Sequence, residues 1–236
     1  MGTVYVRGDT HGQFSEIKYF CESHKTTLDD VLVILGDVGI NIYGSPKDDH
    51  NKRYLSKLPI TLFCIRGNHE MRPSDFDYYE KIFVPRFNCF CWWDKNYPNI
   101  YFPEDGVCYL NGKRCLVCGG AYSIDKDYRL LFDLFWNPTE QMNEEERDSI
   151  LKLVQMSPQF DYVFSHTAPL RYEPTWLFMN GIDQSKVDKT MEKFLDDVYS
   201  KIDLSTLKNW FFGHYHADYQ ITDKVWLLYR LTLELK

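Results

Sequence analysis

Five short polar clusters carry most of the histidines of this 236-residue chain. They are Gly8-Asp9-Thr10-His11-Gly12, Gly36-Asp37, Gly67-Asn68-His69-Glu70, Ser165-His166 and Gly213-His214-Tyr215-His216. Histidine is a common metal ligand through its neutral imidazole. Carboxylate and amide oxygens complete a set that suits Mn, Fe or Zn. The residue types therefore predict that the clusters meet around two divalent metal ions.

A site for two metal ions needs a carboxylate that bridges ions about 3.5–4 Å apart. Asp37 is the candidate, because it stands alone behind Gly36 at the end of a strand-like run. Asp9 and His11 are two residues apart and can reach one ion from a single turn, and Asn68 offers a neutral amide oxygen. The histidines that complete the two sets of ligands are His166, His214 and His216.

Continuous apolar runs precede the first three clusters. The runs are residues 4–6, 31–35 and 60–65, and they are typical of strands buried on both faces. Apolar residues at helical spacing lie between the runs, first at Phe14, Ile17, Phe20 and Cys21 and then at Tyr54, Leu55 and Leu58. Alternating strands and helices predict βαβ units and a mainly parallel sheet. Ligands bind beyond the carboxyl ends of such strands, where the clusters stand.

The later part of the chain predicts a more antiparallel region and two more helices. Residues 99–122 alternate strand-like runs with turns at Asp105-Gly106 and Asn111-Gly112. The pair Asn143 and Glu146 resembles a capping box ahead of an apolar helical pattern. The second helix fits Val187, Met191, Phe194, Leu195, Val198 and Ile202, and residues 225–235 predict one or two strands. We expect a single domain over residues 1–236, because the clusters should meet in one site.

Composition narrows the class of protein. The net charge is −7, so there is no general nucleic-acid-binding signal. No apolar stretch approaches the roughly 18–20 residues of a membrane span. The seven cysteines, with no signal-peptide pattern, favour a reducing, cytoplasmic location. Cys89 and Cys91 with Cys115 and Cys118 could suggest zinc, but buried thiols are favoured, because a strand sends the last two to opposite faces. No pattern in the sequence indicates the oligomeric state.

The ordered clusters resemble those of the calcineurin-like metallophosphoesterase superfamily. Residues 8–13 and 66–70 resemble its serine/threonine protein phosphatase branch. The chain length and residues 119–125 and 165–169 resemble small bacterial and prophage members. The resemblance implies an α/β fold: a four-layer α/β/β/α sandwich of two mixed β-sheets flanked by helices, with a dimetal site at the strand carboxyl ends.

The resemblance also implies a ligand assignment and a mechanism. The first ion would be held by Asp9, His11, Asp37 and His216, and the second by Asp37, Asn68, His166 and His214. The catalytic residues would be Asp37 and His69, with His69 facing the leaving-group oxygen as proton donor or charge stabiliser. A metal-bound hydroxide would attack phosphorus in line. The two ions would be Mn, Fe or Zn, with Mn favoured in vitro.

One departure from the protein phosphatases affects the substrate prediction. Their second motif continues Val-Asp-Arg-Gly, whereas Val38-Gly39-Ile40-Asn41 follows Asp37 in this chain. The Asp that would orient His69 and an Arg that would grip phosphate are both missing. Replacement grips are Arg72, Arg129 and Arg171, because a guanidinium fork matches phosphate geometry. A surface ion pair is the alternative role for each of them.

The sequence thus leaves three functions open. The first is hydrolysis of phosphomonoesters, on a phosphorylated small molecule or a phosphoprotein. The second is hydrolysis of phosphodiesters such as cyclic nucleotides, dinucleoside polyphosphates or nucleic acid, which the missing Val-Asp-Arg-Gly motif favours. The third is a non-catalytic scaffold of the same fold, which the complete ligand set disfavours.

Overall fold

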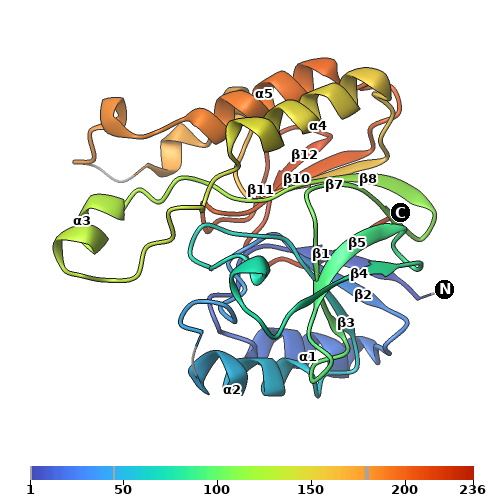
Figure 1. Ribbon diagram of the computed structural model, residues 1–236. Coiled ribbons are helices and arrows are strands. Elements are labelled where there is room, and N and C mark those ends of the chain that lie inside the picture. The colour runs from blue at the N-terminus through green and yellow to red at the C-terminus, as the bar shows by residue number, and fades with distance from the viewer. Residues whose placement is uncertain (1, 45, 179–180) are drawn as a thin grey trace.

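The computed structural model describes residues 2–44, 46–178 and 181–236 (Figure 1). Its helices are α1 (Ser15–His24), α2 (Pro46–Leu55), α3 (Lys126–Leu131), α4 (Glu144–Met156) and α5 (Thr190–Lys201), with short 3-10 turns at Pro73–Asp75, Leu170–Tyr172, Thr175–Leu177 and Gln184–Lys186. Its strands are β1 (Val4–Arg7), β2 (Val31–Ile34), β3 (Thr61–Cys64), β4 (Glu80–Val84), β5 (Cys89–Trp93), β6 (Ile100–Pro103), β7 (Gly106–Leu110), β8 (Lys113–Cys118), β9 (Tyr162–Ser165), β10 (Asn209–Phe212), β11 (Tyr219–Gln220), β12 (Val225–Leu227) and β13 (Leu233–Glu234).

The strands form two mixed sheets that lie face to face between two layers of helices. The first sheet has the order β13-β1-β2-β3-β6-β5-β4, and the second has the order β11-β12-β10-β9-β8-β7. Helices α1 and α2 cover the outer face of the first sheet, and α4 and α5 cover the outer face of the second (Figure 1). The predicted four-layer α/β/β/α sandwich is confirmed.

Three apolar cores hold these layers together. The core between the sheets contains Phe63 from β3 and Phe164 from β9. A second core packs the other face of the second sheet against α4 and α5, with Trp210 fully buried. A third core packs the first sheet against α1 and α2. Strands β1, β2 and β3 are parallel neighbours, as the buried apolar runs predict.

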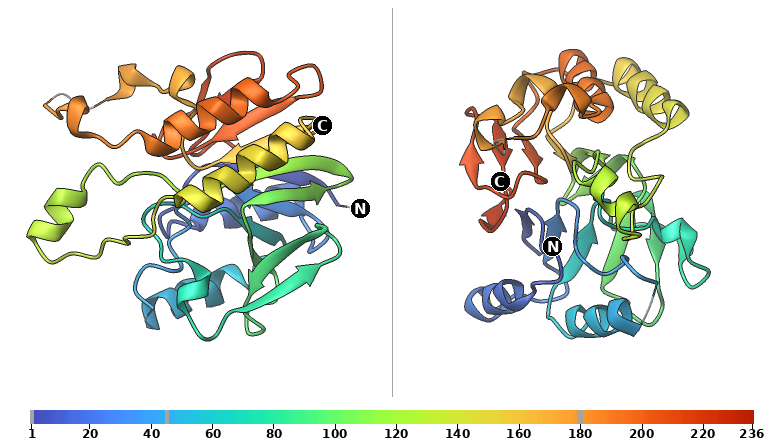
Figure 2. Two further views of the ribbon diagram at one scale, coloured as in Figure 1. Left: turned by 45° about the horizontal axis from the view of Figure 1, so that its top comes forward. Right: turned by 90° about the vertical axis from the view of Figure 1, so that its left-hand side faces the viewer.

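Most of the elements predicted from the sequence are present, with changes at their ends. Asn143 caps α4, and Glu146 completes the capping box. Leu58 lies after α2, and Val187 and Ile202 lie outside α5. Two strands, β12 and β13, occupy residues 225–235. Figure 2 shows that α3, which the sequence patterns did not predict, lies on an arm that projects from the sandwich.

The middle of the chain is antiparallel only in part. Strands β7 and β8 pair as a hairpin across Asn111-Gly112, as predicted. The turn at Asp105-Gly106, by contrast, joins β6 to β7, which lie in different sheets. Strand β6 is parallel to β3 and antiparallel to β5. A positive φ of 133° at Gly106 lets the chain cross from one sheet to the other, which a local turn pattern cannot show.

The cysteines are free and buried, all seven of them. Cys115 lies in the core between the sheets, and Cys118 lies in the core under α4 and α5. The two thiols therefore point to opposite faces of β8, as the strand pattern predicts. Cys115 pairs across the hairpin with Cys108 in the backbone register.

Candidate metal centre

All five polar clusters follow the carboxyl ends of parallel strands. Asp9 and His11 follow β1, Asp37 follows β2, and Asn68 follows β3, all in the first sheet. The ligands from the second sheet are His166, after β9, and His214 and His216, after β10. Each sheet thus supplies one side of the site, which lies where parallel strands usually bind ligands.

The first group of candidate ligands is Asp9, His11 and His216. Their ligand atoms all lie within 4.8 Å of one another. The Nε2 atoms of His11 and His216 are 2.8 Å apart, and His216 Nε2 lies 3.3 Å from Asp9 Oδ2. Two imidazole nitrogens and a carboxylate that face one point are suited to a single divalent ion.

The second group forms around Asn68. Its Oδ1 lies 2.8 Å from His166 Nε2 and 3.1 Å from His214 Nδ1. Asp37 Oδ2 lies 3.5 Å from His166 Nε2 and 3.9 Å from His11 Nε2, so it stands between the two groups. This position supports the bridging role expected for Asp37.

Two unpartnered oxygens show that these residues fit metal ions. Asp9 Oδ2 and Asp37 Oδ2 are buried and have no hydrogen-bond partner. Their other oxygens accept backbone N–H groups, from His214 to Asp9 Oδ1 and from His69 to Asp37 Oδ1, each at 2.9 Å. A buried charged oxygen without a partner is costly unless a cation binds it. The free oxygen of each carboxylate faces the histidine nitrogens, as a metal ligand would.

The backbone at the ligands is strained. Left-handed φ angles of 45° to 68° occur at His11, Asp37, His214 and His216. Such conformations cost free energy for residues other than glycine and concentrate at functional sites. The strained turns support one another, since the N–H of His11 donates to the carbonyl of Asp37 at 2.8 Å. The rest of the fold therefore holds the ligand turns in place.

Charges in the cluster stabilise one another. Burial acts to raise the pKa of Asp37, but His166, His69 and His11 together hold that pKa well below its usual range. Burial acts to lower the pKa of His166, yet Asp37 and Asp9 together raise it to about 9. Burial, together with the charge of His166, lowers the pKa of His214 to about 3. A metal that binds would have to displace the proton of His166, so metal affinity should rise with pH.

The model of the family described as calcineurin-like phosphoesterase matches residues 2–218. This chain belongs to that family. Its members are metal-dependent phosphoesterases, and the predicted superfamily is therefore confirmed.

Comparison with solved structures supports the fold and gives no information on function. One crystal structure is 12% identical to this phosphoesterase, covers 96% of it and 89% of its own chain, and has a TM-score of 0.50. The crystal structure of the protein of unknown function AQ665 from Aquifex aeolicus is 14% identical and covers 71% of this chain and 81% of its own. Its TM-score of 0.32 is too low for a conclusion. No curated protein matches the sequence.

His69 lies beside the candidate metal ligands of this phosphoesterase and is partly buried. Its ring centroid is 5.8 Å from that of His11. Burial lowers the pKa of His69; the nearby charge of Asp37 opposes this effect and that of Arg129 adds to it. Asp125 also acts on His69 through its charge. The charged pair Asp125 and Arg129 is thus close enough to act on the imidazole.

The three arginines proposed as phosphate grips all pair with carboxylates. Arg129 Nε donates to Asp125 at 2.7 Å at the start of the α3 arm. Arg171 pairs with Asp196 of α5 through two nitrogens, at 2.7 and 3.0 Å. The charge of Arg129 acts to lower the pKa of His69, and this proximity to the site distinguishes it among the three.

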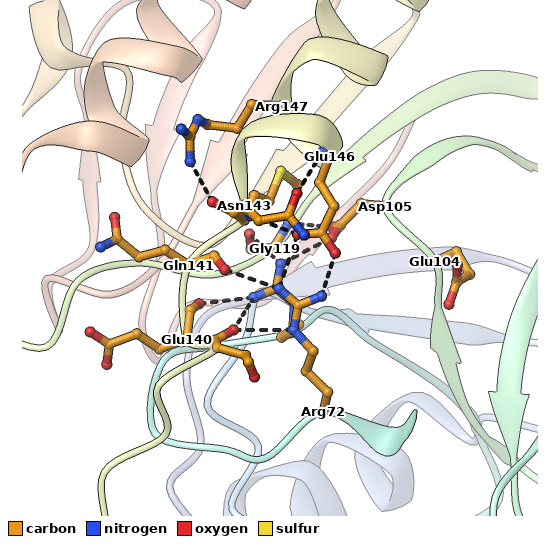
Figure 3. Close-up of polar contacts among 12 residues, drawn as sticks. Arg72, Glu104, Asp105, Gly119, Glu140, Gln141, Asn143, Glu146 and Arg147 are labelled. Atoms are coloured by element: carbon orange, nitrogen blue, oxygen red, sulfur yellow. Dashed lines mark hydrogen bonds and ion pairs between the residues drawn. The ribbon is translucent and has the colours of Figure 1, made fainter. Parts of the chain in front are cut away.

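Arg72 lies between main-chain carbonyls and a carboxylate. It contacts Glu146 through two nitrogens at 2.5 and 3.0 Å and donates to the carbonyl of Gln141 at 3.0 Å (Figure 3). It also lines a cavity of about 370 Å³ together with Trp92. None of the predicted metal ligands lines this cavity. Through these contacts Arg72 joins the loop after β3 to α4 and the segment before it.

Sequence reasoning missed three residues that support the ligands. Glu70 accepts N–H groups from all three residues after Asp37, at 2.7 to 3.1 Å. Ser123 accepts from the amide of Asn68, and Glu140 accepts from Ser123. Glu70 and Ser123 lie in stretches already singled out by resemblance. Glu140 had no such signal, because its link to Ser123 depends on the tertiary fold.

Proposed function

We propose that this chain is a dinuclear-metal phosphomonoesterase that acts on a phosphorylated small molecule or a phosphoprotein. The observation that carries the metal chemistry is the pair of buried, unpartnered oxygens on Asp9 and Asp37, which face histidine nitrogens. Asp9, His11 and His216 would hold one ion. Asn68, His166 and His214 would hold the other, and Asp37 would contact both.

The chain's own residues have distinct tasks in this reaction. When bound, the two ions supply Lewis-acid stabilisation of phosphoryl charge and a nucleophile at neutral pH. Asp37 would fix the two ligand groups relative to each other, because its free oxygen lies between them. His69, whose pKa is lowered by burial, would donate an N–H to the leaving-group oxygen.

Arg129 supports a monoester substrate. A phosphomonoester dianion carries more charge than a diester and gains more from a guanidinium near the leaving group. The side chain of Arg129 is 25% exposed and that of Asp125 is 40% exposed, so solvent reaches their ion pair. An incoming phosphoryl group would compete with Asp125 for the guanidinium.

Hydrolysis of p-nitrophenyl phosphate with Mn²⁺ tests the proposed function. Asp37→Ala and His69→Ala should each remove most of the activity, whereas His50→Ala should retain it, because His50 is exposed on α2 outside the site. Full activity in both of the first two variants would contradict the mechanism. Mn, Fe and Zn all suit these ligands, and elemental analysis of protein from metal-replete cells would identify the bound ion.

A phosphodiesterase is the second candidate, and one observation favours it. All three predicted phosphate grips already pair with carboxylates, which leaves less positive charge for a dianion. Rates on bis-p-nitrophenyl phosphate and on the monoester separate the two functions. In a monoesterase, Arg129→Ala should raise the KM for the monoester at least tenfold and leave the diester KM almost unchanged. A diester rate that exceeds the monoester rate would reverse the assignment.

We also propose a reducing, cytoplasmic setting, which the seven free cysteines support. Among the described residues, no helix is long and apolar enough to cross a membrane. A non-catalytic scaffold is the remaining alternative. It would be supported if protein from metal-replete cells contained no bound metal.

A further inference from the structure

A chain of three buried polar side chains leads from Asn68 away from the metal ligands. Asn68 Nδ2 donates to Ser123 Oγ at 2.8 Å, and Ser123 Oγ donates to Glu140 Oε2 at 2.5 Å. The three residues are only 2%, 1% and 2% exposed. The relay is therefore shielded from water, where hydrogen-bond polarity has its largest effect.

The carboxylate sets the direction of this relay. While Glu140 is ionised, its carboxylate only accepts hydrogen bonds, so the hydroxyl of Ser123 donates to it. The Ser123 oxygen then accepts from its other neighbour, which must be the NH₂ group of Asn68. The amide oxygen of Asn68 consequently points toward His166 and His214. A flipped amide would direct N–H donors at the ion and would leave Ser123 without a donor.

Glu140 is itself held firmly. The N–H of Ser123 donates to Glu140 Oε1 at 3.1 Å, and Arg66 Nη1 donates to the carbonyl of Glu140 at 2.8 Å. Figure 3 shows the Glu140 side chain extending away from Arg72. Arg72 instead contacts the carbonyl of Gln141, the next residue of the chain. Asn137 donates to the carbonyl of Glu70 at 3.0 Å. The segment from Asn137 to Gln141 thus contacts both ends of the loop that carries Asn68.

We propose, building on the metal centre proposed above, that Ser123 and Glu140 are positioning residues for the second metal ion. They fix the amide of Asn68 with its oxygen toward His166 and His214. The ion held by Asp9, His11 and His216 does not depend on them. Groups that orient metal ligands typically change metal affinity by about 10- to 100-fold when they are removed. The relay therefore sets the affinity of one ion in the pair.

Calorimetric titration of the full chain with Co²⁺ tests this role, because it separates the two ions without an activity assay. The wild type should bind two ions. Ser123→Ala should lower the affinity for one ion by about 10- to 100-fold and leave the affinity for the other unchanged. Glu140→Gln should weaken the same ion by about tenfold, because a glutamine can donate to Ser123 and so removes the fixed polarity. The visible spectrum of bound Co²⁺ should show the altered ligand set of that ion.

Glu146→Gln is the matched control. It removes a charge from the same segment, but Glu146 contacts Arg72 and not the relay. Both Co²⁺ affinities should be unchanged in this variant. If Ser123→Ala does not fold, as judged by near-ultraviolet circular dichroism, Glu140→Gln still decides the question.

Each result has one meaning. Unchanged Co²⁺ binding in folded Ser123→Ala and Glu140→Gln would overturn the positioning role. An equal loss of affinity for both ions in these variants would also overturn the positioning role, because such a loss would indicate general damage to the fold. A wild type that binds no Co²⁺ would instead contradict the proposed metal centre itself.

Discussion

Glu70 offers a quantitative test of how the bridging carboxylate is held. Its Oε1 accepts the N–H groups of Gly39 and Ile40 at 2.7 and 3.0 Å, and its Oε2 accepts that of Val38 at 3.1 Å. Hydrogen bonds to a charged group contribute about 1.5–3 kcal/mol each. Glu70→Gln keeps one acceptor oxygen but turns an NH₂ group toward Val38, so it should cost about 2 kcal/mol. Glu70→Ala leaves three buried N–H groups unpaired and should cost at least about 4 kcal/mol.

Urea unfolding of the metal-free protein measures these free energies. Glu22→Ala is the control, because Glu22 forms an exposed i,i+4 pair with Lys18 at 3.8 Å and should change stability by less than about 1 kcal/mol. The turn after Asp37 should also move in the Glu70 variants, so metal affinity should fall in the order wild type, Glu70→Gln, Glu70→Ala. If Glu70→Ala unfolds at the same urea concentration as the control, the turn does not depend on this carboxylate.

Three further outcomes follow from the site and its surroundings. Burial raises the pKa of Glu192 to about 7 despite its hydrogen bond from Thr167, so between about pH 4.5 and 7 the folded state keeps a proton that the unfolded state has lost. The free energy of unfolding therefore falls as pH rises through that window. Glu192→Gln should raise the free energy of unfolding by about 2–3 kcal/mol at pH 8 but by almost nothing at pH 4, which thermal unfolding at the two pH values would measure. A Cβ on Gly36 would lie 2.2 Å from His166 Nδ1, so Gly36→Ala should weaken metal binding at least tenfold in a titration, whereas Gly112→Ala, also at positive φ but with open space around it, should not. Addition of Mn²⁺ at a hundred times its Kd should stabilise the EDTA-treated protein by about 2.7 kcal/mol for each ion, and an unchanged melting temperature would show that the cluster binds no Mn²⁺.

The layers of the fold could be predicted from the sequence because local pattern and tertiary environment agree in β1, β2 and β3. These strands are buried on both faces, so their apolar runs are continuous. The order of the four layers was predicted from the resemblance to the metallophosphoesterase superfamily. The crossing at Gly106 could not be predicted, because a turn pattern does not show which sheet receives the next strand.

The sequence could predict that the candidate metal ligands lie together, because their types are rare and their order along the chain is specific. The residues that orient them could not be predicted, because Glu140 reaches Asn68 only through Ser123, across three separate segments. The contacts of the arginines could not be predicted from the sequence either. A guanidinium in the sequence indicates a possible phosphate contact, but its partner is set by whichever carboxylate the fold brings closest, such as Asp196 for Arg171.

The division of the ligands between two sheets has a consequence for how the protein matures. Asp9 is synthesised about two hundred residues before His216, its partner in the first group of ligands. A ribosome that adds about 5–20 residues per second needs roughly 10–40 seconds to make the intervening chain. During that interval the early carboxylates can hold metal only weakly. Loading of the proposed ion pair would therefore be a late event, and the metal that is plentiful when the second sheet docks would have the first opportunity to enter.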